Sequence, residues 1–166
     1  MRGIALFAAG VVVGGLAVGS AAIAEGEHSS PNMGVIGINH VALAVPDIEK
    51  AVAYYTKVMG FPEAFRVKND KGEIQLVYVQ VSKNTFIEIQ AANAQRPPGI
   101  YHFGVHVENV KNAVDMWKAR GANVQPITGS ATKAVLSNII DPNGVRMELT
   151  ELPPESLHAQ AMARWK

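Results

Sequence analysis

Alternating apolar and polar positions open the first structured part of the chain. Over residues 40–45 the odd-numbered positions are large and apolar, and His40 lies on the other face with two alanines. This period of two predicts a half-buried strand. From residue 48 to residue 55 the apolar positions recur at helical spacing. Asp47 is suited to cap this helix, and Gly60 to end it in a left-handed conformation.

The same order of features returns 62 residues later. His102–Val114 repeats the pattern of His40–Val52, with Asn109 in the place of Asp47. Gly121 follows the second helical stretch as Gly60 follows the first. Self-similarity at a fixed offset predicts two copies of one supersecondary unit.

Each predicted helix is followed by three runs in which the period returns to two. These runs lie near residues 61–68, 73–81 and 85–91 in the first copy, and near 122–128, 133–140 and 145–151 in the second. The fold class is therefore α+β, with two tandem βαβββ modules. Beyond the second module, residues 153–166 are expected to form a C-terminal surface helix that begins at the prolines.

The N-terminal segment has a different character from the rest. Residues 3–24 are apolar apart from one serine, and they follow Arg2 and end in a small-x-small triplet. We interpret residues 1–24 as a secretory signal peptide, which places the protein in the periplasm or outside the cell. The competing interpretation is an uncleaved transmembrane anchor, since 22 apolar residues can span about 30 Å of hydrocarbon. The polar residues 25–35 read as a flexible tether.

Composition narrows the possible partners. Without residues 1–24 the chain has 142 residues with 14 basic and 14 acidic side chains, enough for one domain with its own core. No run of Lys and Arg is present, so nucleic acid is not an expected partner. A stable membrane partner is expected only if the N-terminal segment is an uncleaved anchor. The absence of cysteine excludes disulfides and thiolate metal sites.

Four polar residues occupy equivalent slots in the two copies. His40 and His102 open the first strand of each module, while Glu88 and Glu148 lie in its last strand between apolar neighbours that point to the opposite face. A buried carboxylate is costly unless it is paired or bound to a metal. Two imidazoles and two carboxylates that converge on one point favour a divalent metal site.

Each of these residues also has a simpler interpretation. A single strand histidine is commonly a hydrogen-bonded structural residue, and a single strand glutamate commonly faces solvent. Arg146 shares the face of Glu148, where it either forms a salt bridge with a neighbour or meets an anionic substrate. Tyr78 and Tyr101 are interpreted as packing residues. The joint pattern of two histidines and two glutamates, rather than any one residue, favours the metal site.

Three segments resemble the vicinal oxygen chelate (VOC) superfamily, which includes glyoxalase I, extradiol dioxygenases, methylmalonyl-CoA epimerase and bleomycin resistance proteins. They are Ile38–Asp47, Tyr101–Asn109 and Asp141–Leu149, and the resemblance covers a domain of residues 36–152. It implies a U-shaped cleft in a mostly antiparallel sheet, with a small-molecule substrate and commonly a homodimer. It also implies a divalent ion (Zn, Ni, Mn or Fe) with four ligands, which are His40, Glu88, His102 and Glu148.

The branches of the family differ in their ligand sets. The set His/Glu/His/Glu resembles glyoxalase I, whereas the epimerase branch typically carries glutamine in the slot of Glu88. We therefore expect an exported lyase or isomerase that stabilises an enediolate by Lewis-acid catalysis, with Glu148 or Glu88 as the catalytic base. The alternatives are an Fe(II) extradiol-type dioxygenase, for which His40, His102 and Glu148 suffice, and a metal-free binding protein of the bleomycin-resistance type.

The signal-peptide interpretation predicts the N terminus of the mature protein. Cleavage after the small-x-small triplet should give a soluble exported chain that begins at Glu25, as mass spectrometry of the intact protein from cell fractions would show. Recovery of the full-length chain in the membrane fraction would instead identify residues 3–24 as an anchor.

Overall fold

The computed structural model describes residues 34–166 of the chain. The predicted signal peptide, and residues 25–33 of the predicted tether, lie outside the described residues. Within residues 34–166, no helix is long and apolar enough to cross a membrane.

The first half of the described chain has the order predicted from its periodicity. It is built from strand β1 (Val35–Val45), helix α1 (Ile48–Ala53) with a π-helical turn η1 (Tyr54–Val58), and strands β2 (Glu63–Lys68), β3 (Ile74–Ser82) and β4 (Thr85–Ala91). The predicted helix boundaries are confirmed. The Asp47 carboxylate accepts a hydrogen bond from the backbone N–H of Lys50 at 3.0 Å, and Gly60 is left-handed with φ +76°.

The second half repeats this order with one difference. It contains strand β5 (Gly99–Val107), helix α2 (Val110–Ala119), and strands β6 (Asn123–Val124), β7 (Thr128–Gly129), β8 (Val135–Ile140) and β9 (Arg146–Glu151). The single strand predicted near 122–128 is wrong, because it is divided into β6 and β7, which both pair with β8. Pro126 lies between the two pieces and has no N–H to donate to a strand ladder.

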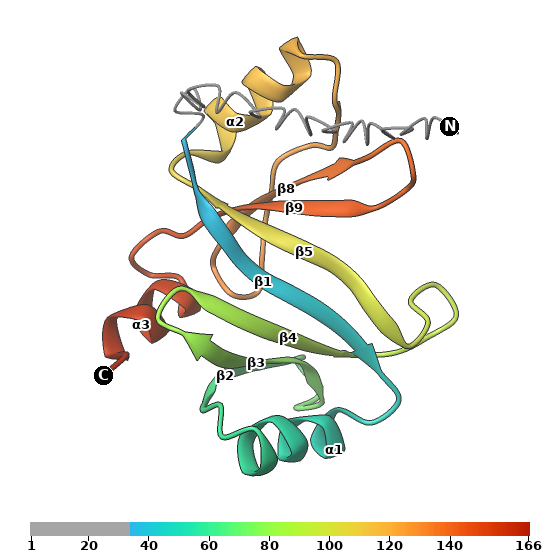
Figure 1. Ribbon diagram of the computed structural model, residues 1–166, viewed down its shortest axis with the longest axis vertical. Coiled ribbons are helices and arrows are strands. Elements are labelled where there is room, and N and C mark those ends of the chain that lie inside the picture. Colours follow the sequence, from blue (N-terminus) through green and yellow to red (C-terminus); the bar gives the residue numbers. More distant parts are fainter. Residues whose placement is uncertain (1–33) are drawn as a thin grey trace, which may run out of the picture. The chain divides into compact units, whose positions relative to one another are not determined.

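All the strands form one mixed sheet in the order β2-β3-β4-β1-β5-β9-β8-β6, with β7 also on β8 (Figure 1). The pairs β1·β4 and β5·β9 are parallel and the other pairs are antiparallel. The two modules meet along the antiparallel pair β1·β5 at the centre of the sheet. The α+β class with two tandem βαβββ modules is confirmed, and the modules pair within a single chain.

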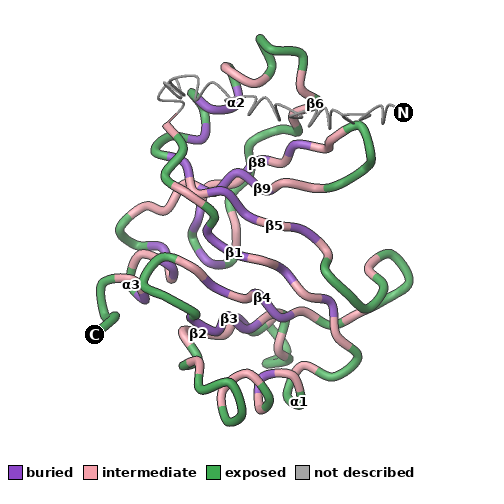
Figure 2. Tube along the Cα trace, viewed as in Figure 1, coloured by how far each residue is buried: buried purple, intermediate pink, exposed green. Residues whose placement is uncertain are grey.

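Helices α1 and α2 each cover the outer face of their own module. Val52 of α1 packs with Val77, Val79 and Ile89, and Val114 of α2 belongs to the equivalent cluster in the second module. Buried residues therefore follow the central strands, while the loops are largely exposed (Figure 2). Because side chains alternate along a strand, the opposite face of the sheet receives the polar residues between these apolar ones.

The C-terminal segment forms a helix, as expected, but this helix begins at Leu157 and not at the prolines. Helix α3 (Leu157–Arg164) has one buried face, which includes His158 and Ala161. Ala161 packs with Tyr78 and Phe86 on the inner face of the first module, and the N–H of Leu157 donates to the backbone carbonyl of Thr132 at 2.9 Å. The helix is thus a wall of the polar inner face.

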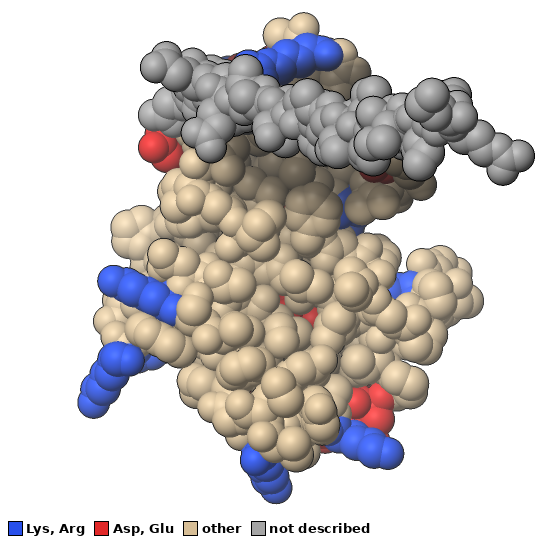
Figure 3. All heavy atoms as spheres, viewed as in Figure 1, with Lys and Arg blue, Asp and Glu red and all other residues tan. Residues whose placement is uncertain are grey.

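The distribution of basic side chains bears on the kinds of partner that the surface can bind. On the face shown in Figure 3, Lys and Arg side chains project from the periphery and do not merge into a continuous patch. Tight binding of a phosphate backbone requires such clustered cations.

Candidate metal centre

Strand register brings Glu88 and His102 to either side of a small residue. Ala42 of β1 is paired with Glu88 of β4 and with His102 of β5. The Ala42 side chain is a single methyl group, so it leaves room for the two longer side chains to approach each other above it. Ala42 itself is only 1% exposed.

A second small residue leaves space in the same way for the other histidine and the other glutamate. Gly104 of β5 is paired with His40 of β1 and with Glu148 of β9. A Cβ atom at position 104 would lie 2.1 Å from Cε1 of the His40 ring, so glycine is required for the imidazole to lie where it does. The two rows are related by the sequence repeat, since Ala42 and Gly104 are 62 positions apart.

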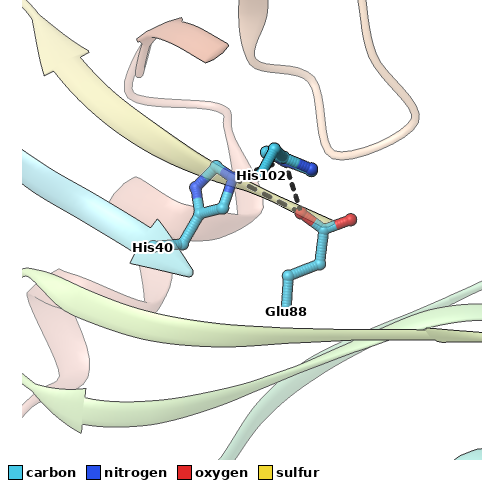
Figure 4. A group of neighbouring side chains, drawn as sticks. All are labelled: His40, Glu88 and His102. Atoms are coloured by element: carbon cyan, nitrogen blue, oxygen red, sulfur yellow. Dashed lines mark hydrogen bonds and ion pairs between the residues drawn. The ribbon is translucent and has the colours of Figure 1, made fainter. Parts of the chain in front are cut away.

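The side chains of His40, Glu88 and His102 converge from three neighbouring strands (Figure 4). The two Nε2 atoms are 3.1 Å apart, and Oε2 of Glu88 lies 3.4 Å from Nε2 of His40 and 3.6 Å from Nε2 of His102. All three side chains are buried. One ligand atom from each residue lies within 4.8 Å of the others, so this group could hold a metal ion.

Glu148 approaches the same point from the second module. Its carboxylate oxygens lie 3.6 Å from Nε2 of His40 and 3.8 Å from Nε2 of His102. The structure therefore brings together all four residues that the sequence repeat singled out, with a glutamate on each flank of the histidine pair.

The spacing and chemistry of these donors fit a divalent ion. Zinc ligands lie about 2.0–2.2 Å from the ion, so neighbouring donor atoms around one ion are about 3–3.5 Å apart. The separations between each imidazole Nε2 and the other donors, 3.1–3.8 Å, are close to this range. Imidazole and carboxylate together suit borderline metals, and the donor set does not distinguish among Zn, Ni, Mn and Fe.

Residues around the cluster orient its side chains, and the sequence had not identified them as functional. The amide oxygen of Asn39 is 2.9 Å from Nδ1 of His40. Because that oxygen can only accept, Nδ1 carries the proton and the Nε2 lone pair is left for the cluster. The Tyr78 hydroxyl donates to Oε2 of Glu88 at 2.7 Å, and the Gln90 amide donates to the other oxygen. Tyr78 is therefore more than the packing residue that was predicted.

Burial shifts the pKa values of the cluster in opposite directions. It lowers the pKa of His40 to about 4 and that of His102 to about 2, with the Arg146 charge as the next cause. Burial raises the pKa of Glu88, and it raises that of Glu148 to about 7 with help from the Glu88 charge. Both imidazoles are therefore neutral at neutral pH, which is the form that binds metals.

Arg146 does not form the predicted salt bridge within the described residues. Its guanidinium contacts Nδ1 of His102 and lies over the Tyr101 ring, 4.4 Å from the centroid. Arg96 lies over the same ring at 5.4 Å. Tyr101 thus contacts two arginines at the edge of the cluster, and their charges make this edge positive.

A cavity of about 200 Å³ lies beside the cluster. Glu88, His102 and Glu148 line it, together with both arginines and His158 of α3. Sequence reasoning missed His158, because this histidine lies outside the repeat and no periodicity relates it to the other histidines. Its position on the inner side of a terminal helix emerges only when that helix packs against the sheet.

The chain belongs to the Glyoxalase/Bleomycin resistance protein/Dioxygenase superfamily, whose family model matches residues 37–149. This match covers both modules and all four predicted ligands, and it confirms the resemblance drawn from the sequence. Helix α3 lies beyond it.

Curated relatives of the chain are epimerases and lyases. The ethylmalonyl-CoA/methylmalonyl-CoA epimerase of Cereibacter sphaeroides is 30% identical over 131 residues, which cover 69% of this chain and 97% of that protein. The human mitochondrial methylmalonyl-CoA epimerase is 31% identical over 88 residues, 46% of this chain and 49% of that protein. The lactoylglutathione lyase of Salmonella typhimurium is 26% identical over 123 residues, 68% of this chain and 90% of that protein.

Solved structures share the fold. The crystal structure of methylmalonyl-CoA epimerase from Mycobacterium tuberculosis aligns with a TM-score of 0.66 at 22% identity, covering 77% of this chain and 95% of that one.

The close approach of His40 to Gly104 generates a test of the cluster geometry. Gly104→Ala should displace the His40 ring, destabilise the fold by about 1–3 kcal/mol through overpacking, and weaken zinc binding about tenfold or more. Urea denaturation and titration calorimetry with Zn²⁺ measure the two effects. Gly129→Ala is the matched control, because a Cβ at that strand glycine would meet no atom within 4 Å. Unchanged zinc affinity in Gly104→Ala would contradict the geometry.

Proposed function

We propose that this protein is a metal-dependent enzyme of the isomerase or lyase type that moves a proton at a carbon next to a carbonyl group of a small oxygenated substrate. The observation that carries the proposal is the convergence of His40, Glu88, His102 and Glu148 beside a cavity. The named activities of the relatives, epimerase and lactoylglutathione lyase, support this reaction class.

The two histidines and two glutamates would hold the ion. A divalent ion bound there would supply Lewis-acid chemistry, since it stabilises the negative charge on two adjacent substrate oxygens when a neighbouring C–H is deprotonated. The protein must then provide a base within reach of that carbon. Glu88 and Glu148 meet this need, because they approach the cluster from the two modules and both line the cavity.

Burial prepares these carboxylates for proton transfer. A carboxylate in water is a weak base at neutral pH. Burial raises the pKa of each glutamate before an ion binds, which makes a carboxylate at this place a stronger base than one in water. The Tyr78 hydroxyl and the Gln90 amide hold Glu88 in place by one hydrogen bond to each oxygen. The carboxylate is therefore oriented before a substrate arrives.

Glu88 is also the residue that separates the branches of the family. A glutamate at this position agrees with the glyoxalase-like ligand set, although the relatives include epimerases as well as a lactoylglutathione lyase. An Fe(II) dioxygenase would need only His40, His102 and Glu148, and a metal-free binding protein would need none of the four. The four-residue cluster supports a proton-transfer enzyme over both alternatives.

The proposal also includes the location and the oligomeric state of the protein. The N-terminal sequence supports export, and the family resemblance supports a homodimer. Because glutathione and coenzyme A are chiefly cytoplasmic, an exported enzyme of this type would act on another small oxygenated molecule.

The metal site predicts a simple stoichiometry. Purified protein should contain close to one divalent ion per chain, and His40→Ala or Glu148→Ala should remove it, because each variant takes away a buried donor. Metal analysis by mass spectrometry measures the content. His106→Ala is the matched control, since His106 shares a face of β5 with His102 but does not line the cavity. Full metal occupancy in both cluster variants would rule these residues out as ligands.

A change at Glu88 tests the reaction. Glu88→Gln should keep the metal, because an amide oxygen still binds it, but should slow proton transfer by about 100-fold or more, since an amide is a far poorer base. Deuterium exchange from solvent into the hemithioacetal of a 2-oxoaldehyde with a small thiol measures the transfer, since this substrate contains neither glutathione nor coenzyme A. The exposed Glu155→Gln provides the control. Oxygen consumption with Fe²⁺ and a catechol that Glu88→Gln leaves intact would favour the dioxygenase instead.

A further inference from the structure

Buried polar atoms without a partner are concentrated around the cavity. Among the described residues, four side chains have a buried nitrogen or oxygen with no hydrogen-bond partner, and three of them line this cavity. The three are Arg146, Thr150 and His158. Such atoms are rare in folded proteins because each one loses its hydrogen bonds to water on burial and gains none in return. Their gathering at one cavity points to a polar molecule that satisfies them.

His158 is the most deeply enclosed of the three. Its side chain is only 1% exposed, and neither ring nitrogen has a hydrogen-bond partner. The ring stacks against His40 at 6.3 Å between centroids and meets the edges or faces of Tyr78, Phe65 and Phe86 at 4.5–5.3 Å. A phenylalanine would fill this aromatic setting without any unpaired polar atom, so packing by itself does not account for a histidine.

Thr150 approaches the cavity from the sheet. It is completely buried, its hydroxyl has no partner, and it lies two residues beyond Glu148 on the same face of β9. A neutral imidazole offers one donor and one acceptor, and a threonine hydroxyl offers both. The cavity therefore presents several hydrogen-bonding groups next to the metal cluster, and their natural complement is an oxygen-bearing molecule.

We propose that His158 and Thr150 form a polar subsite that hydrogen-bonds a further oxygen of the substrate, one that the metal does not hold. The inference rests on the proposed function, because it takes the metal cluster as the anchor for the rest of the molecule. It specifies the substrate class as a small polyoxygenated molecule. The cavity volume of about 200 Å³ suits a small molecule.

His158 lies beyond the part of the chain that the family model matches. The family model ends at residue 149, whereas His158 belongs to α3. Ser156 caps this helix, and the backbone of Leu157 is hydrogen-bonded to that of Thr132, so His158 is held at a defined place in the first turn. The terminal helix is thereby the wall of the cavity that selects the substrate.

Two probes that differ by one hydroxyl test this inference. Lactate and glycerate share a 2-hydroxy acid that can chelate a metal, but only glycerate has a third-carbon hydroxyl. Zinc-loaded wild-type protein should bind glycerate about tenfold or more tightly than lactate by titration calorimetry. His158→Phe should reduce this ratio to near one. Its lactate affinity and zinc content should equal those of the wild type, and its thermal unfolding midpoint should be equal or higher. Thr150→Val should also reduce the ratio.

Two further variants complete the design. His158→Asn, which restores a donor and an acceptor, should recover part of the preference, and His106→Phe, a histidine outside the cavity, should leave it unchanged. Equal affinity for the two probes in wild-type protein, or a ratio that survives both His158→Phe and Thr150→Val, would overturn the inference. Absence of zinc binding would contradict the proposed function, whereas bound zinc with equal affinities for the two probes would contradict the subsite alone.

Discussion

The antiparallel pairing of β1 with β5 is the constraint on which the candidate site depends. Its register pairs His40 with Gly104 and His102 with Ala42, so each imidazole lies over a residue with little or no side chain. The two Nε2 atoms can then meet at 3.1 Å. A slip of one residue between β1 and β5 would turn the side chains of one strand to the other face of the sheet. Glu88 and Glu148, which the parallel pairs β1·β4 and β5·β9 position, would then no longer face two histidines.

Burial gives this cluster its chemical character. Two neutral imidazoles and two carboxylates with raised pKa values lie where water is largely excluded. Such a group is costly without a counter-ion, and the positive edge made by Arg146 and Arg96 offsets only part of that cost. A divalent ion would balance the two carboxylate charges and would use the Nε2 lone pair of His40, which Asn39 directs inward. The buried imidazoles and carboxylates, which replace apolar side chains in this region, make the site suited to a metal and to proton transfer.

The described part of the chain combines a duplicated module with one further helix, α3, beside the cavity. The repeat accounts for the symmetric part of the site, since each module contributes one histidine and one glutamate from equivalent strands. The cavity beside it is not symmetric, because α3 packs on the first module and has no counterpart in the second among the described residues. In our proposal, the metal is held by residues of the two modules alone, whereas the polar subsite combines Thr150 of β9 with His158 of the terminal helix.

The sequence by itself determined the two βαβββ modules, their helix caps and the four residues of the cluster, because these follow from local periodicity and from the repeat. It also determined that Glu88 and Glu148 face inward, since alternation in a strand is a local property. The split of one strand at Pro126, the hydrogen bond from Tyr78 to Glu88 and the need for glycine at position 104 were decided by contacts between elements. His158 is the clearest case, because its ring lies beside His40 only after the last helix packs against the first module, and no spacing along the chain records that contact.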